Sequence, residues 1–143
     1  MISRLRSIPN PDREMPMLLS SVEASFPYGL LVVAAPESTD PHNDWDASTE
    51  TVHARPDSLY IGVRQAASGL VKVRCFEDEE LPSELGLLFT GTLALPSARL
   101  RIYDPDETIS MILSVDGKSM TVTIYADDDD EPASLEIFFS ANR

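Results

Sequence analysis

Apolar and polar residues alternate along most of the chain from residue 51 onward. In the segment 58–64, for example, Leu59, Ile61 and Val63 fall on one face and their neighbours fall on the other. A period of two residues is typical of a β-strand with one buried face. The pattern predicts strands, separated by turns, at 26–35, 51–64 (interrupted at Pro56), 70–76, 85–95, 98–103, 108–115, 119–126 and 134–140.

Turn residues separate these strands, and no long helical period interrupts them. Asp116-Gly117 lies between two alternating segments and is the pair that a type I′ hairpin turn favours. The chain is therefore predicted to be all-β, an antiparallel β-sandwich of about eight strands, with a barrel as the alternative. Residues 26–143 form the predicted sandwich domain. Residues 1–25, which contain several prolines, form a predicted N-terminal arm or edge segment.

Length and composition agree with one folded domain. A chain of 143 residues with 43% hydrophobic residues can bury a core without a metal or a disulfide. The single cysteine, Cys75, excludes an intramolecular disulfide, and its position in an alternating segment indicates a buried strand residue. No segment resembles a signal peptide or reaches the roughly 20 apolar residues of a membrane helix. We therefore expect a cytoplasmic protein without membrane insertion.

The formal net charge of −13 narrows the class of partner. Binding to nucleic acid requires Lys and Arg to replace the counterions of the phosphates, so this balance argues against a nucleic-acid partner. It favours a basic protein, a cation, or simply a well-solvated surface.

The acidic residues are concentrated in particular connections between strands. Four predicted connections hold most of the 24 acidic residues and contain no Lys or Arg: 36–50, 77–84, 104–107 and 127–133. The last contains five consecutive carboxylates, Asp127 to Glu131. If each strand crosses the sandwich from end to end, successive connections alternate between its two ends. Counting strands in this way places all four acidic connections at one end and the turn 66–69 at the other.

We interpret this acidic end first as a docking surface for a basic protein, because concentrated negative charge accelerates association with a positive partner. Trp45, which lies between two aspartates, is a candidate exposed aromatic anchor. The candidate partner-binding residues are Asp44, Trp45, Asp46, Asp78, Glu79, Glu80, Asp104, Asp106, Asp127, Asp128, Asp129, Asp130 and Glu131.

Two other interpretations of the same carboxylates stay open. Calcium binds six to eight oxygen ligands, which Asp-rich loops can supply. The alternative calcium ligands are Asp104, Asp106, Asp127 and Asp129. However, the sequence contains no EF-hand or other ligand-spaced motif, so we predict no cofactor. The remaining interpretation is that the acidic surface only keeps the protein soluble.

No catalytic signature is present. The two histidines, His42 in a predicted loop and His53 in a predicted strand, belong to no recognisable motif that pairs a nucleophile with a base. No glycine-rich loop is suited to cradle a phosphate. We therefore predict that the protein is not an enzyme.

Three stretches of sequence carry a family resemblance. They are Ser58-Leu59-Tyr60-Ile61-Gly62-Val63-Arg64, Val71-Lys72-Val73, and Thr92-Leu93-Ala94-Leu95-Pro96-Ser97-Ala98-Arg99-Leu100-Arg101-Ile102, a strand, a Pro-Ser turn and another strand. They resemble the competence protein J family, small β-sandwich proteins that inhibit a DNA-entry nuclease. The resemblance does not extend to residues 1–50, and the family offers no catalytic motif to transfer.

The resemblance implies an inhibitor or immunity-type role. Nucleases present basic DNA-binding surfaces, which an acidic surface can occlude. The predicted function is a non-enzymatic acidic protein-binding module, an inhibitor or immunity-type protein that occludes a basic nuclease. The alternatives are a calcium-dependent binding module and a structural or secretion-linked accessory protein that uses a sheet face. The sequence predicts neither the identity of the partner nor the oligomeric state.

Overall fold

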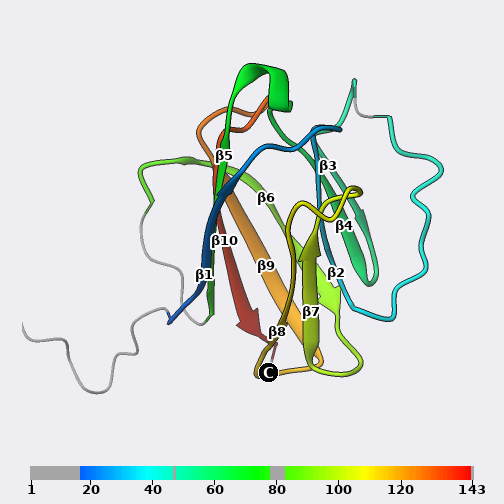
Figure 1. Cartoon of the computed structure of the whole chain (residues 1–143). Coiled ribbons are helices and arrows are strands. Elements are labelled where there is room, and N and C mark those ends of the chain that lie inside the picture. Colours follow the sequence, from blue (N-terminus) through cyan, green and yellow to red (C-terminus); the bar gives the residue numbers. More distant parts are fainter. Residues whose placement is uncertain (1–16, 47, 78–82, 143) are drawn as a thin grey trace, which may run out of the picture.

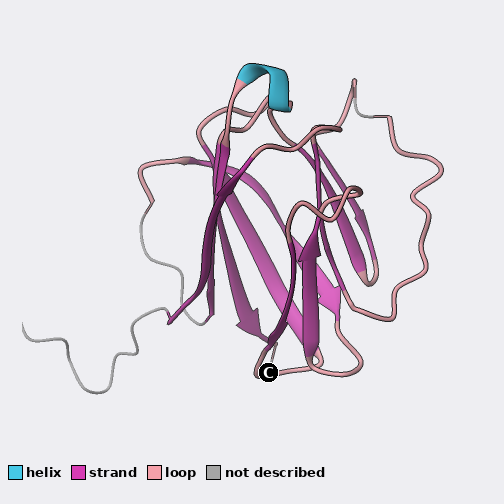
Figure 2. Ribbon diagram, viewed as in Figure 1, coloured by secondary structure: helices cyan, strands magenta, loops and turns pink. Residues whose placement is uncertain are grey.

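Two five-stranded β-sheets pack face to face around one hydrophobic core (Figures 1 and 2). The computed structural model describes residues 17–46, 48–77 and 83–142. The first sheet has the order β1 (Met17–Ala24), β5 (Val71–Glu77), β10 (Ser134–Ala141), β9 (Ser119–Ala126) and β6 (Gly86–Ala94). The second has the order β3 (Val52–Arg55), β4 (Ser58–Gly62), β2 (Leu30–Ala34), β7 (Arg99–Tyr103) and β8 (Ser110–Ser114). One short 3-10 helix, η1 (Ala66–Ser68), precedes β5. The predicted all-β sandwich is confirmed.

Alternating side chains from both sheets fill the space between them. In β5, Val71, Val73 and Cys75 have no solvent exposure, whereas the residues between them are exposed or half-buried. Leu59 and Ile61 of β4 are buried in the same cluster from the opposite sheet. Each large aliphatic side chain buried in this way contributes about 1.5–3 kcal/mol. In β4 and β5 the period of two in the sequence thus identified the core-facing positions correctly.

The described residues form ten strands, where the sequence predicted about eight. The segment 51–64 is two strands, because the chain reverses at Pro56 and Asp57 so that Arg55 pairs with Ser58. The second additional strand is β1, which pairs antiparallel with β5. Part of the predicted N-terminal arm or edge segment is therefore an edge strand of the first sheet.

One pair of neighbouring strands is parallel. β5 and β10 run in the same direction, with Lys72 opposite Ser134 and Phe76 opposite Phe138. The other pairs of described strands are antiparallel. Parallel neighbours require the chain to return to the same end of the sheet between them. Consequently, connections do not simply alternate between the two ends of the sandwich.

The prediction that all four acidic connections share one end is therefore wrong in part. We call the end that carries residues 127–133 the upper end and the end that carries residues 116–118 the lower end (Figure 1). Residues 104–107 lie at the upper end, as predicted. The turn 66–69 lies at the upper end as well, although the strand count placed it at the other.

The remaining two acidic connections run from one end to the other. The connection after β5 leaves the lower end, where the Glu77 carboxylate accepts a hydrogen bond from the Asp116 N–H at 2.7 Å. It reaches β6 at the upper end, where Gly86 is opposite Ala126.

The connection after β2 also begins at the lower end and ends at the upper end, beside the second sheet. It leaves the lower end, where the Ala35 N–H donates to the carbonyl of Asp57 at 2.9 Å. It reaches the upper end before β3, where the Thr51 hydroxyl donates to the main-chain carbonyl of Asp129. We call residues 36–50 the side loop, because Figure 1 shows them beside β3 and β4.

The turn at Asp116-Gly117 is also not the predicted hairpin. β8 pairs with β7 in the second sheet, whereas β9 belongs to the first sheet, so this connection passes between sheets. A type I′ turn requires positive φ at both central residues. Neither Asp116 nor Gly117 has a positive φ. The sequence located the turn correctly but not the partners of the strands that it joins.

Candidate functional site

The acidic connection at the upper end is closed by one of its own aspartates. The Asp127 carboxylate accepts hydrogen bonds from the N–H groups of Ala133 and Ser134, at 2.9 and 3.0 Å. These bonds join the end of β9 to the start of β10. Asp127 therefore shapes the loop, and the next four residues form its exposed tip.

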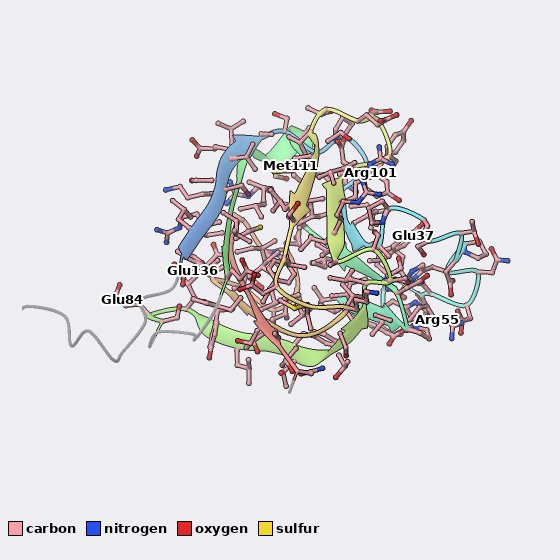
Figure 3. All side chains as sticks on the ribbon, turned by 90° about the horizontal axis from the view of Figure 1, so that it is seen from below. Glu37, Arg55, Glu84, Arg101, Met111 and Glu136 are labelled. Carbon is pink, nitrogen blue, oxygen red and sulfur yellow. The ribbon has the colours of Figure 1, made fainter. Side chains whose placement is uncertain are left out.

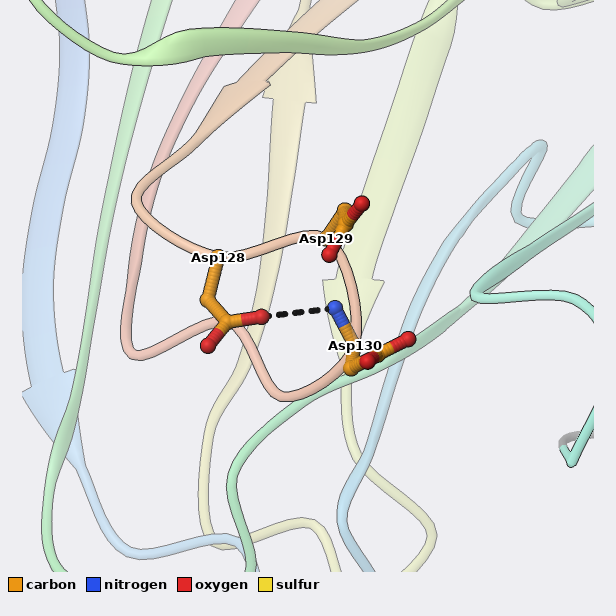
Figure 4. Close-up of side chains that lie close together, drawn as sticks. All are labelled: Asp128, Asp129 and Asp130. Atoms are coloured by element: carbon orange, nitrogen blue, oxygen red, sulfur yellow. Dashed lines mark hydrogen bonds between the residues drawn. The ribbon is translucent and has the colours of Figure 1, made fainter.

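Three consecutive carboxylates converge at this tip. One oxygen from each of Asp128, Asp129 and Asp130 lies within 4.8 Å of the others (Figure 4). Asp128 also accepts a hydrogen bond from the N–H of Asp130 at 2.8 Å, which folds the tip inward. Among the described residues, no Lys or Arg forms an ion pair with this loop. The loop therefore presents uncompensated negative charge to solvent.

A hollow lies beside the acidic loop. It has a volume of about 430 Å³ and lies between the first residues of β6 and residues 126–129. Leu87 and Leu88 supply its apolar wall, and the Leu87 side chain is 62% exposed. Such a surface suits a Lys or Arg side chain. Its aliphatic stem can pack on the apolar wall while its charged end pairs with the carboxylates at the rim.

In the second acidic connection at the upper end, residues 104–107, two of the three carboxylates have a partner within the protein. Asp104 is 1% exposed, and its carboxylate accepts a hydrogen bond from the Ile109 N–H at 2.9 Å. Glu107 pairs with Arg101 at 2.7 Å. Asp106 is exposed. Among the predicted calcium ligands of the described chain, Asp104 and Asp106 belong to no carboxylate cluster of this kind.

The acidic residues of the side loop have partners of their own. Arg55 of β3 lies 2.5 Å from a carboxylate oxygen of Asp44, and Figure 3 shows Arg55 and Glu37 on the opposite side of the molecule from Glu136. Desolvation acts to raise the pKa of Asp44, but the hydrogen bonds from its own N–H and from Arg55 hold the pKa below its ordinary value. Hydrogen bonds from the Ser48 hydroxyl and N–H likewise lower the pKa of Asp46.

Trp45 is half-buried, whereas the sequence suggested an exposed anchor. Its ring packs edge-on against Tyr60 at 5.6 Å between centroids, and its indole N–H donates to the carbonyl of Glu50 at 3.0 Å. The candidate residues Asp78, Glu79 and Glu80 lie outside the described residues.

A buried polar cluster lies beneath the side loop, at residues that the sequence did not bring together. His42 Nε2 lies 2.8 Å from the hydroxyl of Ser58, and His42 Nδ1 lies 2.9 Å from Nδ1 of His53. All three residues are less than 9% exposed. The His42 ring also stacks on Tyr60, with 3.7 Å between centroids and an interplanar angle of 5°. Burial is the main cause that lowers the pKa of His42.

No local signal in the sequence could have identified this cluster. Residues 42, 53 and 58 lie on three different segments, and the contact forms only when the side loop folds back onto β3 and β4. The backbone of His42 itself has a φ of 52°, which is in the left-handed region. Non-glycine residues rarely adopt this region, so the surrounding contacts must hold it.

Two further predictions concern single features of the chain. Cys75 is fully buried in β5, and burial raises the pKa of its thiol to about 12, so it is an inert strand residue as predicted. Within the described ranges, no helix is long and apolar enough to cross a membrane.

Two proteins of known structure have a similar fold. No protein-family model and no curated protein sequence matches the chain. The structure is similar to that of ComJ, inhibitor of the DNA-degrading activity of NucA, from Bacillus subtilis, with a TM-score of 0.67 and 14% identity over 90% of this chain and 100% of ComJ. It is also similar to the structure of crocagin biosynthetic gene J, with a TM-score of 0.59 and 14% identity over 91% of this chain and 100% of that one. At this identity the likeness establishes a shared fold, and it confirms the resemblance to the competence protein J family.

Proposed function

We propose that this protein is a non-enzymatic inhibitor that binds a basic nuclease through its acidic upper end. One observation carries the proposal: residues 127–131 present five carboxylates on a fold shared with ComJ, and no described Lys or Arg neutralises them. A net charge of −13 adds long-range attraction to a positive partner.

Charge complementarity gives this surface a mechanism. A nuclease must hold the phosphates of DNA with Lys and Arg, and the same side chains can pair with the carboxylates of Asp128, Asp129 and Asp130. The hollow beside Leu87 can receive the aliphatic part of one such side chain. Bound in this way, the protein occupies the surface that DNA would use. Asp106, exposed in the connection 104–107 at the same end, adds a further carboxylate.

The experiment compares two double variants that each remove two negative charges, but from different parts of the surface. Asp129→Asn with Asp130→Asn removes two charges from the tip, where neither side chain accepts a hydrogen bond from another described residue. Glu37→Gln with Asp116→Asn removes two charges elsewhere. NucA, the nuclease named with the ComJ structure, and nucleases recovered from the host on the immobilised protein are the probes. DNA degradation is measured against inhibitor concentration.

We expect the tip variant to need about tenfold more protein for half-inhibition, equivalent to about 1.4 kcal/mol of binding. The control variant should inhibit like the wild type. Equal inhibition by all three proteins would show that the acidic tip is not the docking surface. Absence of inhibition by the wild type against every nuclease tested would overturn the proposed role itself.

A calcium-dependent binding module is the second candidate. The observation that favours it is the convergence of the Asp128, Asp129 and Asp130 carboxylates within 4.8 Å. Calcium requires more oxygen ligands than these three residues supply, so water or a partner would have to complete the site.

A further inference from the structure

A continuous chain of polar side chains joins the side loop to the second sheet. It begins at the Ser58 hydroxyl of β4, passes through both ring nitrogens of His42, and reaches Nδ1 of His53 in β3. On the far side, Nε2 of His53 lies 3.5 Å from Asp44 and 4.0 Å from Glu50. Every link of this chain connects groups that can donate or accept a proton.

With both histidines neutral, one arrangement of hydrogens satisfies the whole chain. The Ser58 hydroxyl donates to His42 Nε2, His42 Nδ1–H donates to His53 Nδ1, and His53 Nε2–H points toward the carboxylate of Asp44. In the opposite arrangement, an unprotonated His53 Nε2 would face that carboxylate, lone pair against negative charge. The neutral chain therefore has a preferred direction.

The same chain accepts one added proton without losing a contact. If the hydrogen bonds reverse, His53 carries hydrogens on both nitrogens, His42 donates from Nε2 to Ser58, and the contact between the two Nδ1 atoms remains. A second proton has no such solution. Both Nδ1 atoms would then carry hydrogens pointed at each other across 2.9 Å, on two positively charged rings.

The charged groups around the pair also favour uptake of one proton and oppose uptake of a second. Asp40 and Asp44 of the side loop, with Glu50 just before β3, favour the first proton. Arg55 of β3 and burial beneath the loop oppose the second. Tyr60 of β4 stacks on one face of the His42 ring.

We propose that the contact between His42 and His53 is a proton-sensitive latch that holds the side loop on the second sheet and releases it when both rings are protonated. Release removes the ring of His42 from Tyr60 and frees the left-handed backbone at His42. The inference is independent of the proposed nuclease partner.

The chain carries its own reporter for this event. Trp45 is the single tryptophan, and its ring contacts Tyr60 only while the side loop is docked. His42 and His53 are the only histidines, the side chains that ordinarily change charge between about pH 5 and 8. Trp45 emission and imidazole NMR signals can therefore be followed together over that range in the wild-type protein.

We expect Trp45 emission to shift to longer wavelength as the second histidine signal titrates, while the far-UV circular dichroism of the sandwich stays unchanged. Once the docked pair holds its first proton, amide exchange in residues 36–50, corrected for its intrinsic pH dependence, should accelerate by about tenfold for each unit by which the pH falls, because release then takes up one further proton. Titration of both rings with no change in emission or exchange would overturn the latch. Emission that changes only together with loss of the whole fold would overturn it as well.

A variant separates protonation of the pair from other effects of acid. Glutamine at position 53 can still hydrogen-bond His42 but cannot take up a proton, so His53→Gln should abolish the shift between about pH 8 and 5. Glu23→Gln, at an exposed position of β1 in the other sheet, should keep it. A His53→Gln protein that shows the wild-type transition would contradict the proposal. If His53→Gln instead fails to dock the loop at any pH, the wild-type titration decides.

Discussion

Asp127 and Asp129 lie two residues apart in one acidic loop, yet only Asp127 holds the loop together. Its carboxylate accepts hydrogen bonds from Ala133 and Ser134, whereas no hydrogen bond to the Asp129 carboxylate is present among the described residues. The same residue type therefore serves structure at one position and is available to a partner at the other.

This difference predicts opposite results for two substitutions. Asp127→Ala should lower the free energy of unfolding by about 1 kcal/mol, because two N–H groups lose their acceptor. Asp129→Ala should change it by less than about 0.5 kcal/mol. Urea unfolding followed by circular dichroism measures both. Equal destabilisation by the two substitutions would contradict the assignment.

Reversing charge at the acidic tip should weaken partner binding more than neutralising it. For Asp129→Lys with Asp130→Lys we expect at least about tenfold weaker binding to the nuclease at low salt. The affinity should also depend less steeply on salt concentration, since fewer opposite charges attract across solvent. Titration calorimetry at several salt concentrations tests this. Glu37→Lys with Asp116→Lys is the matched control, and identical salt dependence for both variants would argue against docking at the tip.

Calcium offers a direct test between the two candidate functions. A ligand that binds only the folded state raises its stability, so a calcium site must raise the melting temperature. We expect no difference between melts in millimolar calcium and in chelator. A rise that disappears in Asp129→Asn with Asp130→Asn would instead support the calcium-dependent module.

Gly29 occupies a turn position that no other residue can take without strain. Its φ is +61°, and an added Cβ would lie 3.0 Å from the carbonyl oxygen of Val63. Gly29→Ala should therefore destabilise the protein by more than about 1 kcal/mol. Gly86→Ala is the control, because a Cβ there meets nothing closer than 3.8 Å. Similar melting temperatures for the two variants would show that the turn adapts.

The buried pair of histidines predicts a pH-dependent contribution to stability. Burial lowers the pKa of His42 below its unfolded value of about 6.5, so its neutral form stabilises the fold above that pH. This contribution is lost as the pH falls from about 6.5 through the lowered pKa. The difference in unfolding free energy between the wild type and His42→Gln should therefore shrink from pH 7.5 to pH 5. A constant difference would show that His42 does not titrate in the folded protein.

Local sequence patterns determined the strands, the turns and the charge of this protein. Alternation placed Leu59, Ile61 and Val73 in the core, because a strand exposes successive side chains to opposite faces. Asp116-Gly117 marked a turn, and the run from Asp127 marked an exposed acidic loop. These properties depend on neighbouring residues, and neighbouring residues are what a sequence shows.

Tertiary structure decided which strands pair and what the loops cover. The parallel pairing of β5 with β10 brings the 66–69 turn to the end that carries the acidic loop, and no local pattern records that choice. The contact between His42 and His53 depends on a loop that folds back across the sheet against its own backbone preference. Such contacts arise from the packing of distant segments, so only the folded chain could bring the two rings together.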